Sequence, residues 1–356
     1  MRNRKYALLL TAVLLAAAPA LAQQAPSPAT AQPKFPTPPP AVTAENSIIG
    51  PGYANAPESV AAPDVPQGDI REFIMYSEDS KIYPGIVRAQ DMQRDARGNY
   101  FVPAGTSLSK PGRYERHVYV YIPKQYVAGT AAPFMVVQDG HSYVKRMANI
   151  MDNMIAAKRL PPMVLVLADS GGSDAQGSER GLEYDTVSGR YSNWVEQELL
   201  PAVSQRYGVT FTSDPEGRAT MGGSSGAAAA FTMAWYHPER YHKVLSYSGT
   251  FVNQAWPVDP ATPRGAWEYH DHLIAKAAKK PIRIWMEVGE KDNRYDNPEE
   301  TWHNWPLANN RMAAVFKKKG YDHRYVFAME AGHVDNRVVM QTLPAALEWL
   351  WRDYPK

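Results

Sequence analysis

The sequence predicts an α/β protein built on a mostly parallel central sheet with helices on both faces. After Gly68, short apolar runs alternate along the chain with amphipathic segments, and most of these runs are apolar throughout. Strands buried on both faces of a parallel sheet have this continuous apolar character, and alternation of strands with helices is typical of a doubly wound sheet. The region 67–356 is therefore expected to form one domain.

Each expected strand is a compact apolar run bounded by turn residues. The first, ERHVYVYIP, alternates between apolar and polar residues as a half-buried strand does, whereas the later ones are suited to central strands. The expected strands are 115–123, 133–139, 162–169, 218–223, 242–249, 281–289 and 323–329. Helical spacing of apolar residues predicts helices near 141–158, 190–206, 225–236, 266–279, 304–319 and 338–352.

The first residues have the features of a secretory signal peptide. Basic residues precede an apolar run, and Ala20-Leu21-Ala22 is a small-residue cleavage site. The run is too short to span a bilayer comfortably. We expect residues 1–22 to be removed after Ala22, which predicts a periplasmic or secreted protein with no membrane association after cleavage. An uncleaved anchor is the alternative.

Residues 23–66 are rich in Ala, Pro, Gln, Ser and Thr, with PTPPP at 36–40. Such a segment buries too little apolar surface to offset the entropy of ordering it. It is therefore predicted to be a disordered, partly polyproline linker. A ligand for a proline-binding module is the alternative.

Composition excludes several classes of function. The chain contains no cysteine, which removes disulfides, thiolate zinc sites and a cysteine nucleophile. Its net charge of +2 is nearly balanced and has no basic block, so nothing indicates a nucleic-acid partner.

A serine turn provides the strongest catalytic signal. Gly222-Gly223-Ser224-Ser225-Gly226 fits G-x-S-x-G between an expected strand and an expected helix, which is the pattern of the α/β-hydrolase nucleophile elbow. Small neighbours are needed because the turn brings strand and helix close together around a strained serine. Ser224 is preferred to Ser225 because it has glycine two residues away on each side. A helix-capping glycine turn is the alternative.

In this fold the acid and the histidine follow the serine along the chain. His333 comes after the last expected strand and before the last helix, where a general base is expected. The loop GEKDNRYDN offers Glu290, Asp292 and Asp296 as the acid that orients the histidine. Asp292 is preferred and Asp296 is the second choice.

An oxyanion hole requires two backbone donors. The N–H of Ser225 is one candidate, and the turn Asp139-Gly140-His141 after an earlier central strand offers the other. Gly140 would allow the turn, and the His141 amide would point toward the carbonyl oxygen of the substrate. An ordinary tight turn is the alternative.

These stretches together resemble the enterochelin esterase-like branch of the Putative esterase family, which also includes relatives of esterase D and feruloyl esterases. The resemblance covers most of residues 80 to 352. It rests on RHVYVYIPKQY, PFMVVQDGHSYV, ERGLEYD followed by YSNWVEQELLPAV, GRATMGGSSGAAAAFTMAW, GEKDN and AGHVDNRVVMQTLPAALEWLW. It implies an α/β-hydrolase fold and a serine hydrolase of ester bonds without a metal or other cofactor.

The resemblance also implies roles for individual residues. Ser224, Asp292 and His333 fall on the catalytic triad, and Ser225 and His141 fall on the oxyanion amides. Two small-residue departures, Ala227 and Ala331 in place of glycines that relatives often have, leave this chemistry intact.

Further residues could bind the substrate. The resemblance places Arg180 and Glu183 on an R-x-x-E pair near the pocket, which would either orient substrate or pin its loop. Trp302 and Trp305 could stack on a sugar or aryl ring, or else pack a helix onto the sheet.

Two segments stand apart from the family pattern. Residues 89–112 look like an insertion without an assigned role, and residues 250–280 occupy the usual place of a variable lid. In that lid, His270 and His272 could suggest a metal ion. Without a further clustered ligand we expect no metal there.

The sequence thus predicts an exported serine esterase that acts on a small-molecule or carbohydrate ester, with carbohydrate, aryl and siderophore esters all open. An acyltransferase to a sugar hydroxyl is one alternative on the same fold. A non-catalytic carbohydrate-binding relative is the other, because a fold alone does not determine function.

Overall fold

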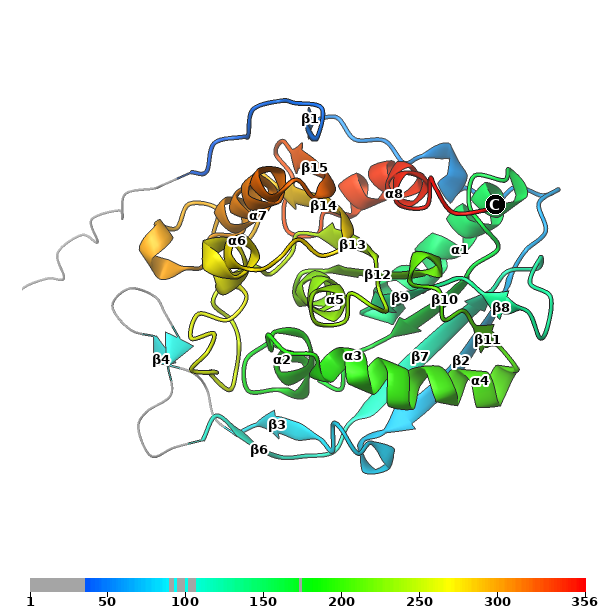
Figure 1. The fold of residues 1–356 in the computed structure, drawn as a ribbon, viewed down its shortest axis with the longest axis horizontal. Coiled ribbons are helices and arrows are strands. Elements are labelled where there is room, and N and C mark those ends of the chain that lie inside the picture. The colour runs from blue at the N-terminus through cyan, green and yellow to red at the C-terminus, as the bar shows by residue number, and fades with distance from the viewer. Residues whose placement is uncertain (1–35, 90–92, 95–99, 102–106, 173–174) are drawn as a thin grey trace, which may run out of the picture. The chain divides into compact units, whose positions relative to one another are not determined.

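The computed structural model describes residues 36–89, 93–94, 100–101, 107–172 and 175–356. The predicted signal peptide, residues 1–22, lies outside these residues. The centre of the molecule is a nine-stranded sheet with the strand order β1-β15-β14-β13-β12-β9-β10-β7-β2 (Figure 1). Its strands are β1 (Asn46–Ile49), β2 (Asp69–Tyr76), β7 (Glu115–Ile122), β9 (Phe134–Gln138), β10 (Val164–Ala168), β12 (Arg218–Gly223), β13 (Lys243–Tyr247), β14 (Arg283–Gly289) and β15 (Asp322–Ala328).

From β1 to β10 every neighbouring pair of strands is parallel, and only β7 and β2 run antiparallel to their neighbours. The central strands are fully buried because both faces are covered, which is why their sequences are continuously apolar. The predicted α/β-hydrolase fold class is confirmed by this topology.

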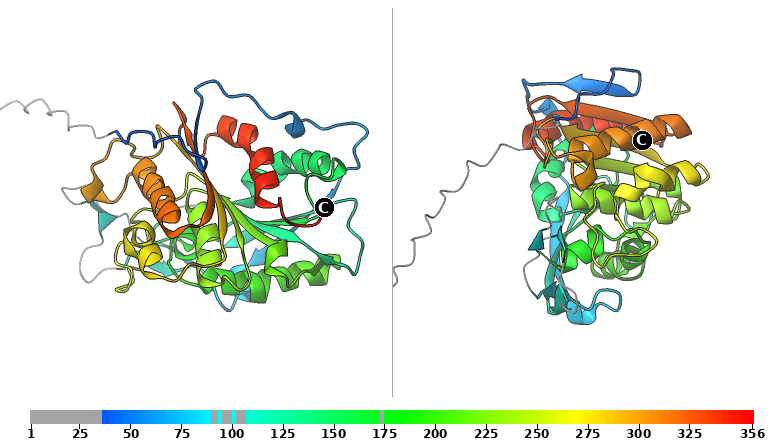
Figure 2. Two further views of the ribbon diagram at one scale, coloured as in Figure 1. Left: turned by 45° about the horizontal axis from the view of Figure 1, so that its top comes forward. Right: turned by 90° about the vertical axis from the view of Figure 1, so that its left-hand side faces the viewer.

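Helices cover the sheet on both faces, as the views in Figure 2 show. One hydrophobic core cluster lies between one face of the sheet and the helices α1 and α8. The larger cluster lies between the other face of the sheet and the remaining helices. The helices are α1 (Gly140–Ala156), α2 (Glu179–Tyr184), α3 (Arg190–Trp194), α4 (Leu200–Tyr207), α5 (Ser225–Tyr236), α6 (Ile274–Lys276), α7 (Trp305–Lys319) and α8 (Asn336–Leu350).

Two predicted helices are interrupted. Residues 190–206 form α3 and α4 joined by a π-helical segment, Val195–Leu199, and residues 266–279 contain a π-helical segment, Tyr269–Leu273, that runs into α6. Apolar spacing at a helical period does not distinguish an α-helix from a helix with a π-bulge, since such bulges are set by tertiary packing.

The segment predicted to be a disordered linker, residues 23–66, is ordered in its described part, and this prediction was wrong there. Strand β1 pairs in parallel with β15 at one edge of the sheet. A 3₁₀ turn, Pro57–Ser59, then packs on α1, where the side chains of Asn149 and Asn153 donate to backbone carbonyl groups of residues 58–60. The segment therefore supplies an edge strand and a strap across the helical layer.

The expected insertion, residues 89–112, begins and ends at a small antiparallel pair, β3 (Ile86–Arg88) with β6 (Ser109–Pro111). Between them, β4 (Gln93–Arg94) pairs with β5 (Tyr100–Phe101), and residues 90–92, 95–99 and 102–106 of the insertion lie outside the described residues. One more short pair joins β8 (Ala131–Ala132) to β11 (Thr210–Phe211). In the described part of the chain, no helix combines the length and the apolar character needed to cross a bilayer.

Candidate active site

The serine turn connects β12 to α5 and has the strained geometry that its glycines predict. Ser224 has φ 57° and ψ −129°, a conformation that costs about 1–3 kcal/mol for a residue other than glycine. A β-carbon on Gly222 would lie 2.3 Å from the carbonyl carbon of Gly226, so strand and helix approach too closely for any side chain there. The turn therefore lifts the Ser224 side chain away from the strand at its carboxyl end.

Ser224, His333 and Asp292 form one continuous chain of hydrogen bonds. The Nε2 atom of His333 lies 2.7 Å from Ser224 Oγ, and Nδ1 lies 2.5 Å from Asp292 Oδ1. The His333 side chain is 25% exposed and that of Asp292 is fully buried, so water reaches the histidine but not the acid. Because the acid holds Nδ1–H, Nε2 is left as the acceptor that faces the serine hydroxyl.

The loops that carry the acid and the histidine are pressed together at the ends of β14 and β15. A β-carbon on Gly289 would lie 2.4 Å from the carbonyl oxygen of Ala331. The backbone N–H of Lys291 donates to that same Ala331 oxygen. These contacts fix the acid loop against the loop of His333, and they place Asp292, rather than the rest of GEKDNRYDN, at the imidazole.

Two further side chains support the histidine and the serine. The Trp305 ring meets the His333 ring edge to face at 6.1 Å, and its Nε1 donates to Thr250 Oγ1 at 3.3 Å. Thr250 Oγ1 in turn lies 3.3 Å from Ser224 Oγ. Trp305 is only 4% exposed, so the expectation that it stacks on a substrate ring was wrong: its indole packs behind the histidine.

Trp302 occupies a different environment from Trp305. It is half-buried, has a left-handed backbone (φ 54°), and lies beneath the guanidinium of Arg264 at 5.6 Å. Its ring is therefore engaged by a cation from the lid segment. Stacking of this ring on substrate stays a prediction.

The two expected oxyanion turns lie next to each other but present their amides differently. Ser225 is the first residue of α5, and its backbone N–H is not taken up by the helix. The His141 N–H instead donates to Asp169 Oδ1 at 2.9 Å, and the His141 ring also contacts that oxygen. This differs from the expected free amide, because the end of β10 brings an acidic side chain to the start of α1.

Gly140 has a different role from the one expected. The left-handed residue in this turn is Asp139, with φ 56°, and Gly140 begins α1. A β-carbon on Gly140 would lie 2.6 Å from the Leu167 carbonyl carbon. The glycine is thus required for close approach of α1 to β10 rather than for the bend itself.

A cleft of about 810 Å³ opens beside the serine turn. Asp139, His141, Asp169, Arg180 and Tyr114 are among the residues that line it. Asp139 joins the cleft to the turn, since its carboxylate would lie 3.2 Å from a β-carbon on Gly226. Arg180 faces this cleft with its guanidinium paired to Asp139 at 2.8 Å.

Glu183 does not face the cleft, and its predicted role in substrate binding was wrong. Its carboxylate is fully buried and forms a two-pronged ion pair with Arg116, whose Nη1 lies 2.8 Å from Oε2. The Arg116 guanidinium also lies over the Trp194 ring at 4.1 Å. The helix α2 therefore places its arginine at the cleft and its glutamate in the core, a difference that the R-x-x-E spacing does not reveal.

Replacing Glu183 with glutamine should lower the free energy of unfolding by about 3–5 kcal/mol, because it leaves the buried Arg116 charge without a counter-charge. Urea unfolding measures this. The double variant Arg116→Met/Glu183→Leu should recover most of the loss, since it removes both charges. As a matched control, Asp69→Asn at the exposed Arg71–Asp69 pair should change stability by less than about 1 kcal/mol. Equal effects of the two single variants would contradict the buried ion pair.

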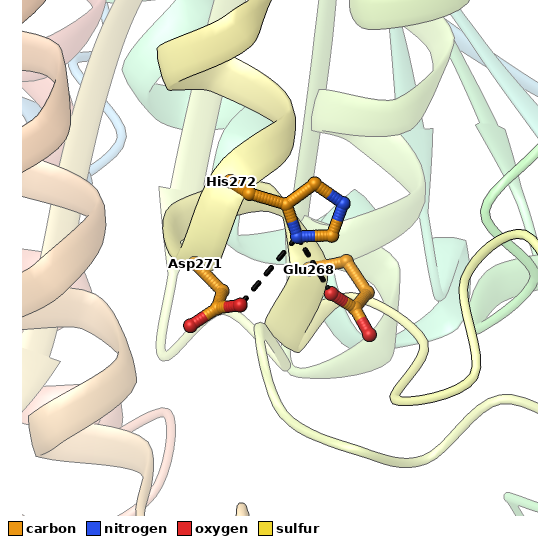
Figure 3. A group of neighbouring side chains, drawn as sticks. All are labelled: Glu268, Asp271 and His272. Carbon is orange, nitrogen blue, oxygen red and sulfur yellow. Dashed lines mark hydrogen bonds and ion pairs between the residues drawn. The ribbon is translucent and has the colours of Figure 1, made fainter.

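The lid segment holds the histidines that had suggested a metal. His270 is buried against Trp267 and its Nε2 lies 3.0 Å from the Phe251 carbonyl oxygen; burial, with Arg311 nearby, lowers its pKa to about 3. His272 instead lies 2.9 Å from Glu268 and 3.5 Å from Asp271, as Figure 3 shows.

The cluster of Glu268, Asp271 and His272 is already neutralised by arginine. Arg264 contacts Glu268 at 3.0 Å and Asp271 at 2.7 Å, and Arg311 contacts Asp271 at 3.4 Å. His270 and His272 therefore lie in different environments, one in the core and the other beside two carboxylates. The absence of a metal stays a prediction for this site.

A buried glutamate lies beneath the acid loop. Glu287 on β14 is fully buried, and neither of its carboxylate oxygens has a hydrogen-bond partner among the described residues. Burial, together with the charges of Asp292 and Asp335, raises the pKa of Glu287 well above its usual value. Burial therefore favours the protonated, neutral form of Glu287 beneath the loop that carries Asp292.

This shift has a consequence for stability. The folded protein binds a proton at Glu287 that the unfolded chain releases above about pH 4.5, so the stabilisation is present at acidic pH and is lost as the pH rises toward the folded-state pKa. In Glu287→Gln this loss should disappear, and urea unfolding at pH 5 and pH 8 should show a smaller decrease in stability than in the wild type, by up to about 1.4 kcal/mol per pH unit. The exposed Glu300→Gln is the control. If the free energy of unfolding decreased equally in the wild type and in Glu287→Gln between pH 5 and pH 8, the raised pKa of Glu287 would be contradicted.

Residues important to the site also include several that the sequence did not single out. Asp185, Thr250 and Gln254 all contact the serine turn or its neighbours. Of these three, only Asp185 carried a usable signal, because it ends the ERGLEYD stretch. The others lie in loops whose partners are far away in sequence.

Comparison with known proteins is consistent with this geometry. The Putative esterase family model matches residues 109–350. YbbA of Bacillus subtilis is 22% identical over 258 residues, which are 69% of this chain and 96% of that protein. S-formylglutathione hydrolase of Paracoccus denitrificans is 28% identical over 137 residues, 35% of this chain and 48% of that enzyme.

Among solved structures, enterobactin esterase from Shigella flexneri in the presence of enterobactin superimposes with a TM-score of 0.54 at 21% identity. The match covers 82% of this chain and 60% of that chain, so it spans less than two thirds of the enterobactin esterase and describes the shared fold. The family model covers well over half of the present sequence. The chain accordingly belongs to the Putative esterase family and is an ester hydrolase with the α/β-hydrolase fold.

Proposed function

We propose that the protein is an exported serine carboxylic-ester hydrolase that uses Ser224 as nucleophile, His333 as general base and Asp292 as the acid that orients the histidine. The observation that carries this proposal is the unbroken hydrogen-bond chain Asp292–His333–Ser224, with distances of 2.5 and 2.7 Å. These distances lie within the range over which a base can take a proton from a nucleophile.

In the first half of the reaction, Ser224 Oγ attacks the ester carbonyl carbon while its proton moves to His333 Nε2. The buried Asp292 carboxylate then stabilises the imidazolium through Nδ1–H. The Ser225 N–H at the start of α5 supplies one donor to the oxyanion, and the amide end of the helix favours the negative charge. For the second donor we propose the His141 N–H of the β9–α1 turn, which must first leave Asp169 Oδ1, its acceptor in the resting enzyme.

Collapse of the tetrahedral intermediate releases the alcohol, which takes its proton from His333. The acyl group stays on Ser224 Oγ. Water then attacks this acyl-enzyme, giving its proton to His333, and the carboxylic acid leaves as the serine regains its proton. No metal or cofactor takes part in the proposed cycle.

The proposed substrate is a small-molecule or carbohydrate ester, of the carbohydrate, aryl or siderophore kind. The cleft beside the serine turn has the volume to hold a ring, and Tyr114 at its wall offers an aromatic face. The similar proteins include an enterobactin esterase and an S-formylglutathione hydrolase, which by their names act on an ester and on a thioester, and both support transfer of an acyl group to water. The predicted signal peptide, residues 1–22, supports export, and we propose that the protein acts in the periplasm or outside the cell.

The proposal is tested with a panel of acetylated and feruloylated saccharides, aryl esters and a siderophore trilactone, ranked by kcat/KM, which reports differential binding of the transition state. A fluorophosphonate probe should form an adduct that mass spectrometry assigns to the Ser224 peptide. Product analysis with added glucose decides the acceptor. Folded protein that neither reacts with the probe nor hydrolyses any ester would contradict the enzyme proposal, and transfer to glucose in preference to water would make it an acyltransferase.

A further inference from the structure

The short helix α2 contacts the first of the two turns that would supply oxyanion donors. Arg180 donates from Nη2 to Asp139 Oδ2 at 2.8 Å and from Nε to Oδ1 at 3.3 Å. The backbone N–H of Asp139 donates to Tyr184 Oη at 3.3 Å. Both the carboxylate and the amide of the left-handed Asp139 are therefore held by residues of one helix.

Asp185, the C-cap residue of α2, is linked through Gln254 to the second turn, that of Ser225. Gln254, from the lid segment, donates from Nε2 to Asp185 Oδ2 and to Ser225 Oγ, each at 3.1 Å. Asp185 is 3% exposed and Ser225 is fully buried. Burial raises the pKa of Asp185 to about 6, although Arg180, the Ser225 hydroxyl and the Gln254 amide all favour its ionised form.

The two turns also touch each other. A β-carbon on Gly226 would lie 2.9 Å from Gln138 Cβ, which precedes Asp139. Turns in direct contact can still slide or tilt relative to each other unless a third element holds both. The backbone N–H groups of an oxyanion hole must lie 2.7–3.1 Å from the developing oxyanion, so small changes in their spacing have large kinetic effects.

We propose that α2 and Asp185 clamp the two oxyanion turns to each other, with Arg180, Asp185 and Gln254 as positioning residues for the Ser225 amide and the β9–α1 turn. The planar guanidinium of Arg180 suits this task because its two-pronged contact fixes orientation as well as distance. The inference rests on the proposed function, and it assigns Arg180 a role other than direct contact with substrate.

The clamp predicts specific kinetic effects for two variants, Arg180→Met and Gln254→Ala. Each should lower kcat for p-nitrophenyl acetate on the order of 10²-fold, the typical cost of a small misplacement in an active site, and leave KM within about 2-fold of the wild type. Binding of a trifluoromethyl ketone, which forms an oxyanion on Ser224, should weaken by the same factor as kcat/KM.

A matched control is Arg159→Met, which also removes an arginine–carboxylate contact (Arg159 to Glu348, 2.8 Å) but at the far end of α1. It should leave kcat and inhibitor binding unchanged even if it lowers the melting temperature. If Arg180→Met does not fold, Gln254→Ala and Asp139→Asn test the same clamp from its other members.

The outcomes separate the clamp from the enzyme proposal. A rise in KM alone for Arg180→Met would overturn the clamp and make Arg180 a substrate-binding residue. Unchanged kcat and unchanged inhibitor affinity in folded Arg180→Met and Gln254→Ala would also overturn it, while the wild type remained an esterase. A wild-type protein without fluorophosphonate labelling or ester hydrolysis would instead overturn the proposed function on which the clamp rests.

Discussion

Replacing Ser224 with alanine should lower kcat for p-nitrophenyl acetate on the order of 10⁶-fold, because no other group in the chain of contacts can form the acyl-enzyme. The side chain removed is one oxygen atom, whose contacts are His333 Nε2 and Thr250 Oγ1. Alanine keeps the backbone strain of this turn, so the melting temperature should stay close to that of the wild type. Stopped-flow or spectrophotometric release of p-nitrophenol and a thermal melt measure the two effects.

A suitable control is Ser225→Ala, which removes the neighbouring hydroxyl but keeps the backbone N–H. It should retain the fluorophosphonate adduct on Ser224. Turnover that persists in Ser224→Ala and disappears in Ser225→Ala would show that the register of the nucleophile is wrong.

The second large effect is expected for Asp292→Asn, with a loss in kcat of about 10⁴-fold. An asparagine that donates to His333 Nδ1 stabilises the tautomer that carries its proton on Nε2, and that nitrogen can no longer accept the proton of Ser224. The fold should tolerate the change, since Asp292 is only 1% exposed and a buried carboxylate becomes a neutral amide of the same shape. The measurements are kcat and the melting temperature at neutral pH.

Asp296→Asn provides the matched control, because Asp296 lies in the same loop and was the second choice for the acid in the sequence analysis. This variant should keep kcat within a few fold of the wild type. The reverse result, with activity lost in Asp296→Asn and kept in Asp292→Asn, would contradict the contact between Asp292 and His333 as the functional one.

The positions of the central strands along the chain could be predicted because apolar runs and turn residues are local properties of the sequence. The run RATMGG is buried at every position in β12, and Gly222 within it and Gly226 after it are needed by a turn only a few residues long. The serine, acid and histidine could be predicted for the same reason: each follows a strand at the carboxyl edge of a parallel sheet. Chain order and strand position were enough to bring them into one site.

The partners of surface and lid residues could not be predicted, since they depend on contacts distant in sequence. Arg180 and Glu183 are three residues apart on one helix, yet one faces the cleft and the other is buried against Arg116. Similarly, nothing in the sequence near His141 indicates that Asp169 will accept its amide N–H. Helical spacing gives the relative directions of side chains but not the direction of the core.

Strand β1 escaped prediction because it is only four residues long, NSII, in a region whose composition suggests disorder. Its pairing with β15 joins residues almost 280 positions apart, for example Asn46 with Tyr325. Short strands at sheet edges depend on such distant partners more than on their own residue preferences.

The strand β1 and the strand β2 lie at opposite edges of the sheet, and the chain from residue 50 to residue 68 connects them. While that connection is intact, β1 is held near β15 at a high effective concentration, and it shields an open row of backbone donors and acceptors. A single proteolytic nick in the connection would make this pairing bimolecular. Dissociation of the fragment that carries β1 would then leave β15 as an unpaired edge strand that can pair with another copy of the protein. The serine and its partners would still be in place.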